Sequence, residues 1–127
     1  MQVGAKAVYD IALFDWAKGL PRDEQGRVLV PLYGDLKRHD MTDNQIDALG
    51  NELLSQRFVD RNIFQTAELW GVGSTQPYGH RNDFSSLNDI ILAHGGNGRQ
   101  ARDAYEAASE AEKSALIAFL KTLVIVP

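Results

Sequence analysis

The sequence of 127 residues contains no cysteine. Disulfides, thiolate metal sites and a cysteine nucleophile are therefore all excluded for this chain. Long apolar runs are missing as well, since the longest is the interrupted stretch 115–126, which is too short to span a bilayer. Residues 1–6 lack the charged, apolar and small-residue regions of a secretory signal, so we expect a mature fragment or a cytoplasmic chain.

An excess of basic charge is also absent. The chain has 13 Lys and Arg against 17 Asp and Glu, a net charge of -4, which gives no broad attraction for nucleic acid or an anionic membrane. Its 44% hydrophobic and 24% charged content is ordinary for a globular protein. At this length we expect one domain that covers residues 1–127.

The apolar pattern favours helices. Residues 9–20 have apolar side chains at helical spacing and end at Gly19 and Pro21, whereas residues 28–33 read as a short strand or an extended segment. Thr42 or Asp43 is expected to cap a helix over residues 46–54. Residues 58–77 have no clean periodicity and contain several glycines, so we expect an ordered loop there.

Two capping signals open further helices in the second half. Ser86, three residues before Asp89, predicts a helix over residues 87–94, which Gly95 would end. Ser109 and Glu112 form a capping box before apolar residues spaced as in a helix at 116, 119, 120 and 123. The predicted fold class is all-α, a small helical domain with long ordered loops and at most a minor β-hairpin.

Three histidines are the candidates for chemistry. His94 shares a helix face with apolar residues, which is typical of a histidine in the core or at a helix end. The alternative is an iron ligand, since Gly95 and Gly96 would let a flat macrocycle approach the backbone beside it. His80 lies in a polar turn that either caps a helix or handles protons beside a cofactor. His39, close to Met41, is a third potential ligand.

The order of these features resembles a known family. The segments 64–80 (FQTAELWGVGSTQPYGH), 84–87 (FSSL), 94–96 (HGG) and 118–123 (AFLKTL) resemble the C-terminal domain of the di-haem cytochrome c peroxidase and MauG superfamily, and in particular its di-haem oxidoreductase branch. The upstream segment 32–41 (LYGDLKRHDM) is similar to a segment of that branch. The resemblance covers about residues 31–123 and implies a cytochrome-c-like helical domain.

The resemblance also implies roles for particular residues. His94 would occupy the place of the distal axial ligand to the haem iron, and a histidine there would give a bis-His, low-potential centre suited to electron transfer. His80 matches a turn histidine near the space between the two haems and is the expected catalytic residue. The backbone carbonyls of Thr75 and Pro77 match positions that hold calcium in relatives. The expected cofactor-binding residues are His94, Gly95, Trp70, Tyr78 and Arg81.

Relatives attach each haem through a Cys-x-x-Cys-His motif, which this sequence lacks. The resemblance therefore implies a c-type haem held by an N-terminal portion or a partner subunit, with an electron-donor protein as a further partner, in the periplasm. The chain would then be part of a di-haem oxidoreductase or peroxidase and inactive alone. Two alternatives stay open, a haem-free helical interaction module and non-covalent b-type haem binding through His94, alone or with His39.

Overall fold

The computed structural model describes residues 15–31, 33–51 and 60–125. The chain forms two compact units, Met1–Leu32 and Tyr33–Pro127, and each is described by itself. The single domain expected over residues 1–127 stays a prediction. The segment 31–123, which carries the resemblance, falls almost wholly in the second unit.

The first unit contains helix α1 (Asp15–Lys18), which ends just before Gly19, as predicted. The remainder of the helix expected over residues 9–20 lies mostly outside the described residues. Val28 pairs with Arg22 in an isolated antiparallel bridge, so the chain is extended at Val28, as one of the two predictions for residues 28–33 has it. In the turn between Arg22 and Val28, the Asp23 carboxylate accepts hydrogen bonds from backbone N–H groups. A side-chain cap of this kind stabilises a short turn without a core of its own.

The second unit contains a two-stranded antiparallel ribbon. Strand β1 (Arg38–Asp40) pairs with β2 (Ile63–Gln65), and His39 lies opposite Phe64. The prediction of a continuous loop over residues 58–77 is wrong at β2. Three-residue strands are too short for an alternating pattern to be recognised, and here the pairing partner is distant in sequence.

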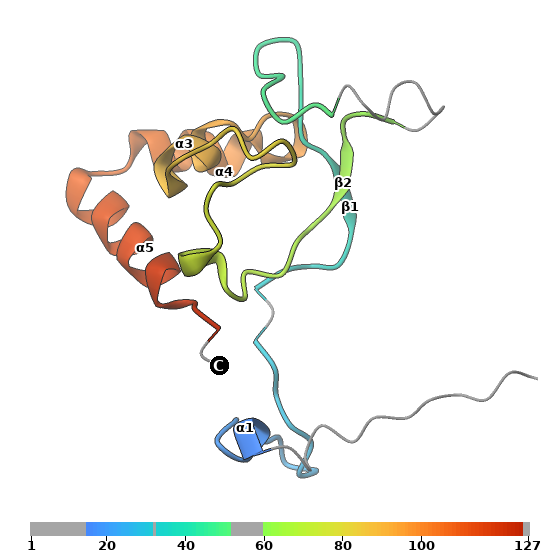
Figure 1. The fold of residues 1–127 in the computed structure, drawn as a ribbon, viewed down its shortest axis with the longest axis vertical. Coiled ribbons are helices and arrows are strands. Elements are labelled where there is room, and N and C mark those ends of the chain that lie inside the picture. Colours follow the sequence, from blue (N-terminus) through green and yellow to red (C-terminus); the bar gives the residue numbers. More distant parts are fainter. Residues whose placement is uncertain (1–14, 32, 52–59, 126–127) are drawn as a thin grey trace, which may run out of the picture. The chain divides into compact units, whose positions relative to one another are not determined.

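Three helices lie on the other side of this unit (Figure 1): α3 (Leu87–Leu92), α4 (Arg99–Ala107) and α5 (Glu110–Thr122). The Ser86 hydroxyl accepts from the backbone N–H of Asp89 at 3.1 Å, which confirms the predicted start of α3. The capping box between Ser109 and Glu112 is formed as predicted at the start of α5. The sequence pattern did not identify α4, whose apolar face consists mainly of small alanine side chains beside the buried Tyr105.

A small core joins these helices. Leu87, Tyr105 and Leu120 are buried, one on each helix, and the Tyr105 hydroxyl donates to the side-chain oxygen of Asn88 at 3.0 Å. At the end of α5, the backbone N–H of Gly73 donates to the carbonyl of Leu123 at 3.1 Å, which holds the 3-10 helix Val72–Ser74 against α5.

The predicted helix over residues 46–54 is wrong in its described part. Residues 46–51 form turns, and residues 52–54 lie outside the described residues. Asp43 still acts as a cap, because its carboxylate accepts from the backbone N–H groups of Gln45 and Ile46, but it closes a turn. Leu49 is buried nonetheless, so here the apolar pattern indicated a buried side chain without a helix.

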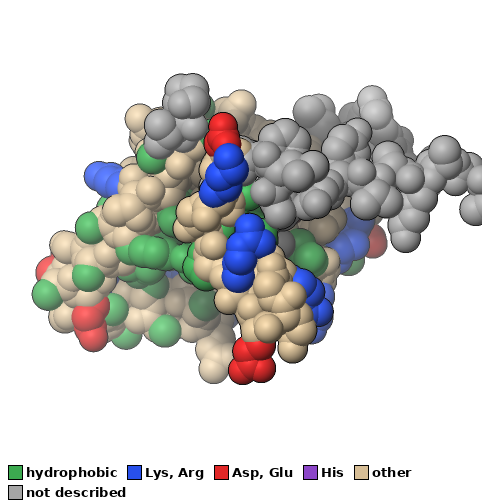
Figure 2. Space-filling model, turned by 90° about the horizontal axis from the view of Figure 1, so that it is seen from below, with side chains coloured by type: hydrophobic (Ala, Val, Ile, Leu, Met, Phe, Trp, Pro, Cys, Tyr) green, Lys and Arg blue, Asp and Glu red, His purple; other side chains and the backbone are tan. Residues whose placement is uncertain are grey.

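The architecture of the described residues is mostly helical, with long ordered loops and one two-stranded ribbon, which confirms the predicted fold class. In these ranges no helix is long and apolar enough to cross a membrane. Hydrophobic side chains are visible among polar ones on the face drawn in Figure 2. On α5, the apolar side chains of Leu116 and Phe119 are about 40% exposed. The predicted apolar face of α5 is therefore only partly buried.

Candidate functional site

A cavity of about 560 Å³ lies within the second unit. Its wall is built from β1, β2, the loop before the 3-10 helix, the turn that contains His80, α3 and the turn that follows α3. Apolar side chains predominate in the wall: Tyr33, Met41, Leu49, Phe64, Leu69 and Ile90. A concave and mostly apolar space with a few polar groups is the usual form of a cofactor or ligand site.

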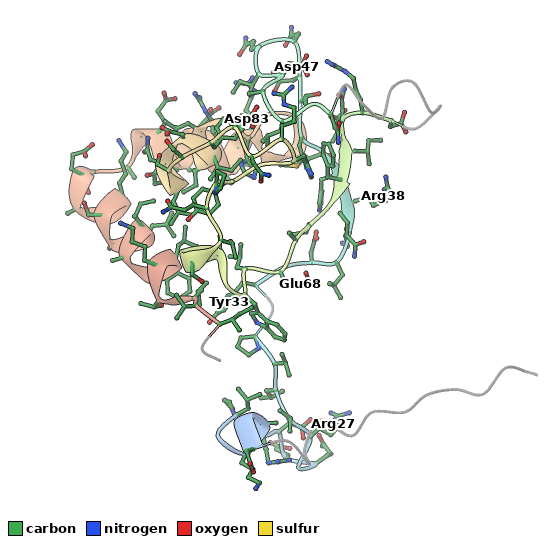
Figure 3. All side chains as sticks on the ribbon, in the orientation of Figure 1. Arg27, Tyr33, Arg38, Asp47, Glu68 and Asp83 are labelled. Carbon is green, nitrogen blue, oxygen red and sulfur yellow. The ribbon has the colours of Figure 1, made fainter. Side chains whose placement is uncertain are left out.

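All three histidines of the chain line this cavity. His39 comes from β1, His80 from a turn and His94 from the end of α3. Arg38 extends away from β1 (Figure 3), and side chains alternate along a strand, so His39 faces the opposite side, where the cavity lies. The tertiary structure thus gathers three imidazoles that are scattered along the sequence.

His94 is held by the helix that precedes it. Its ring Nδ1 lies 2.6 Å from the carbonyl oxygen of Ile90, one turn earlier. A carbonyl oxygen only accepts, so Nδ1 carries the hydrogen of the neutral ring and the lone pair is on Nε2. Among the described residues Nε2 has no hydrogen-bond partner. This arrangement is typical of histidines that bind a metal, because the second-shell carbonyl fixes both tautomer and ring orientation.

The glycines after His94 lie against the protein's own backbone, and a contact of Gly95 with a cofactor stays a prediction. A Cβ on Gly95 would lie 2.8 Å from the carbonyl oxygen of Ile46, and one on Gly96 would lie 2.4 Å from that of Asp40. These two residues therefore admit the protein's own backbone at close range, and they do not line the cavity. Gly98 lines it instead, with its missing Cβ 3.0 Å from Met41 Cε.

Asp43 forms hydrogen bonds that hold its own loop against the turn after His94. Its carboxylate accepts from the backbone N–H of Gly96 at 2.8 Å and from two guanidinium nitrogens of Arg99. The Arg99 guanidinium, aided by backbone N–H donors, holds the pKa of Asp43 well below its ordinary range. Asp43 and Arg99 were not singled out as site residues, because an Asp and an Arg 56 positions apart carry no sequence signal of their pairing.

His80 stacks on Phe64, with ring centroids 3.8 Å apart and an interplanar angle of 20°. Partial burial lowers the pKa of His80, since desolvation disfavours the charged imidazolium. His80 therefore reaches the cavity as a ring held against an aromatic side chain. Its catalytic role stays a prediction.

The remaining predicted cofactor residues lie away from the cavity wall. The Tyr78 hydroxyl donates to the carbonyl of Val72 at 3.0 Å, and Arg81 binds Asp83 and the carbonyl of Ala48. The side chain of Trp70 is 46% exposed.

Thr75 and Pro77 lie in an exposed turn. In the described part of the chain no group of three or more His, Asp or Glu side chains could hold a metal ion. A calcium site made of the backbone carbonyls of Thr75 and Pro77 stays a prediction.

Comparison with known proteins gives one match. A family model described as "Di-haem oxidoreductase, putative peroxidase" matches residues 24–123, which is most of the chain. Neither the curated proteins nor the solved structures contain a match to this sequence. The match includes the whole cavity wall, with all three histidines, and the family is one of haem proteins. This chain belongs to the di-haem oxidoreductase family.

Proposed function

We propose that this chain supplies His94 as an axial ligand, together with an apolar pocket wall, to a haem that an N-terminal portion or a partner subunit holds covalently. The observation that carries the proposal is the 2.6 Å contact from Nδ1 of His94 to the carbonyl of Ile90, which leaves Nε2 for a metal. The haem would exchange one electron between its ferric and ferrous states. A histidine as axial ligand favours a low potential.

The cavity fits such a group in its chemistry. A haem macrocycle is flat and largely apolar, and the wall presents aromatic and aliphatic side chains with an imidazole among them. Because the 127 residues contain no cysteine, thioether attachment has to come from a Cys-x-x-Cys-His segment outside them, in an N-terminal portion or a partner subunit. We place this assembly in the periplasm, with an electron-donor protein as its redox partner and peroxide reduction or substrate oxidation as its reaction.

The chain's own residues have three tasks in this proposal. Ile90 orients the His94 ring, and the bonds of Asp43 to Gly96 and Arg99 hold the turn behind it. The apolar wall excludes water from the iron, which stabilises the less charged ferrous state.

The test uses a haem peptide, in which a short Cys-x-x-Cys-His segment carries a covalent haem with one coordination position open. Added to the full chain, this peptide should change from a high-spin to a low-spin visible spectrum as His94 binds. His94→Ala should lose the change, whereas the matched variant His80→Ala, from the same cavity, should keep it. Circular dichroism of each variant checks that it is folded.

A second measurement separates ligation from general packing. His94→Met should keep a six-coordinate haem but raise its midpoint potential, because a thioether ligand favours the ferrous state relative to imidazole. If the wild-type chain leaves the spectrum of the haem peptide unchanged, the proposal fails and a haem-free helical interaction module becomes the better description.

A further inference from the structure

A second histidine of the cavity is held by a carboxylate. Nε2 of His39 lies 2.7 Å from Oδ2 of Asp35. The other oxygen of Asp35 accepts from the Thr66 hydroxyl at 2.6 Å and from the backbone N–H of Lys37 at 3.0 Å. These donors, with Thr66 first, keep the pKa of Asp35 well below its ordinary value, so this carboxylate is negative across the neutral range.

The turn that presents Asp35 is strained. Tyr33 and Leu36, on either side of it, have φ angles of 53° and 58°, in the left-handed region that side chains with a Cβ rarely adopt. Strain of this kind is found where a particular side-chain position is needed. An ion pair on the surface would not require such backbone strain. His39 is partly buried, since its side chain is 32% exposed and also lines the cavity.

His39 and His94 are held in different ways, and the difference separates their roles. His94 uses Nδ1 for a neutral carbonyl and keeps Nε2, the unhindered nitrogen, which suits an iron ligand. His39 uses Nε2 for a carboxylate and keeps Nδ1, which is crowded by the adjacent Cβ and unsuited to a bulky macrocycle. A carboxylate that accepts from a ring N–H orients the imidazole, as in catalytic Asp–His pairs, and this arrangement suits proton transfer.

We propose that His39, positioned by Asp35, takes up a proton from solvent when the haem of this cavity gains an electron and releases it when the electron leaves. One proton and one electron enter together, with the electron supplied by the redox partner, so the charge inside the apolar wall stays constant. This inference rests on the proposed function of the cavity. It assigns to the Asp35–His39 pair a role as a redox-linked proton carrier.

Other groups near His39 must be separated from it in the test. β2 contributes no ionisable side chain, since it consists of Ile63, Phe64 and Gln65. The ionisable residues next to His39 in the chain and across the cavity are Tyr33, Asp35, Lys37, Arg38, Asp40, His80 and His94. Arg38 points away from the ribbon (Figure 3), and the two other histidines can each be replaced.

The test measures the midpoint potential of the complex between the full chain and the haem peptide from pH 5 to pH 8. The potential of the wild-type complex should fall as the pH rises, with a steeper slope than that of the haem peptide bound to free imidazole. His39→Gln should lose this excess slope, and Asp35→Asn should flatten it, while both keep the low-spin spectrum. His80→Gln is the matched control and should keep the slope.

Three results would overturn the proposal. An unchanged slope in both His39→Gln and Asp35→Asn would show that the pair exchanges no proton with the redox step. Loss of the low-spin spectrum in a folded His39→Gln chain would make His39 a ligand or a structural residue instead. Failure of the wild-type chain to form the low-spin complex at all would reject the proposed function itself, and this inference with it.

Discussion

An alanine in place of Gly96 should push the turn after His94 away from the loop that packs against it. Its φ angle is +49°, and a Cβ built there would lie 2.4 Å from the carbonyl oxygen of Asp40 and 2.7 Å from that of Thr42. Both neighbours are backbone atoms, which cannot rotate away as a flexible side chain can. Gly96→Ala therefore combines left-handed strain with a steric clash.

The magnitude follows from two contributions, the left-handed strain and a lost hydrogen bond. The left-handed conformation costs an alanine about 1 to 2 kcal/mol. Relief of the clash requires a shift of about 1 Å, the gap between the built position and an ordinary contact. Such a shift stretches the 3.0 Å bond from Gly95 N–H to the Met41 carbonyl, whose loss costs about 1 kcal/mol. We expect a total of about 3 kcal/mol in the free energy of unfolding.

The assay is thermal unfolding of the full chain followed by circular dichroism. For a unit of this size, about 3 kcal/mol should lower Tm by roughly 12 to 24 °C. The matched control is Gly34→Ala, which has no positive φ. Its Cβ would lie 3.3 Å from the Thr66 methyl group and 3.6 Å from the Ala67 carbonyl oxygen, so its effect should be below about 1 kcal/mol. If Gly96→Ala melts within about 2 °C of this control, the reasoning is refuted.

Three further changes test separate contacts. The folded state keeps the pKa of Asp43 below its ordinary 3.8, so the Asp43 carboxylate contributes its full stability above that pH and loses it as the pH falls toward the lowered pKa. In Asp43→Asn, the free energy of unfolding measured by urea denaturation should therefore depend less steeply on pH below 3.8 than in the wild type. Ser109→Ala removes the N-cap of α5 and should destabilise by about 1 kcal/mol in thermal unfolding, with Ser109→Thr as the variant that retains a cap. Tyr78→Phe deletes the hydrogen bond to the Val72 carbonyl and should cost about 1 kcal/mol by the same measurement, while an unchanged Tm would mean that this bond contributes nothing.

Helix starts were predictable wherever the signal was local. Ser86 and Ser109 cap α3 and α5 as expected, because a capping bond joins residues only three positions apart. The strands were not predictable, since β1 and β2 gain their hydrogen bonds only from each other. The helix expected after Asp43 was wrong over residues 46–51, because an Asx cap can close a turn as readily as it opens a helix, and only packing decides between them.

The site divides in the same way. The sequence by itself determined the mostly helical class, the lack of any cysteine and the family resemblance, and it identified His94, His80 and His39 as candidate site residues. Only the tertiary structure decided that these three meet at one cavity and that Asp35 and Ile90 hold two of the three rings. It also decided that Gly95 and Gly96 lie close to the backbone of residues 40–46. The reason is physical: which side chains meet around a cavity depends on how distant segments pack, and no local pattern of residues records that.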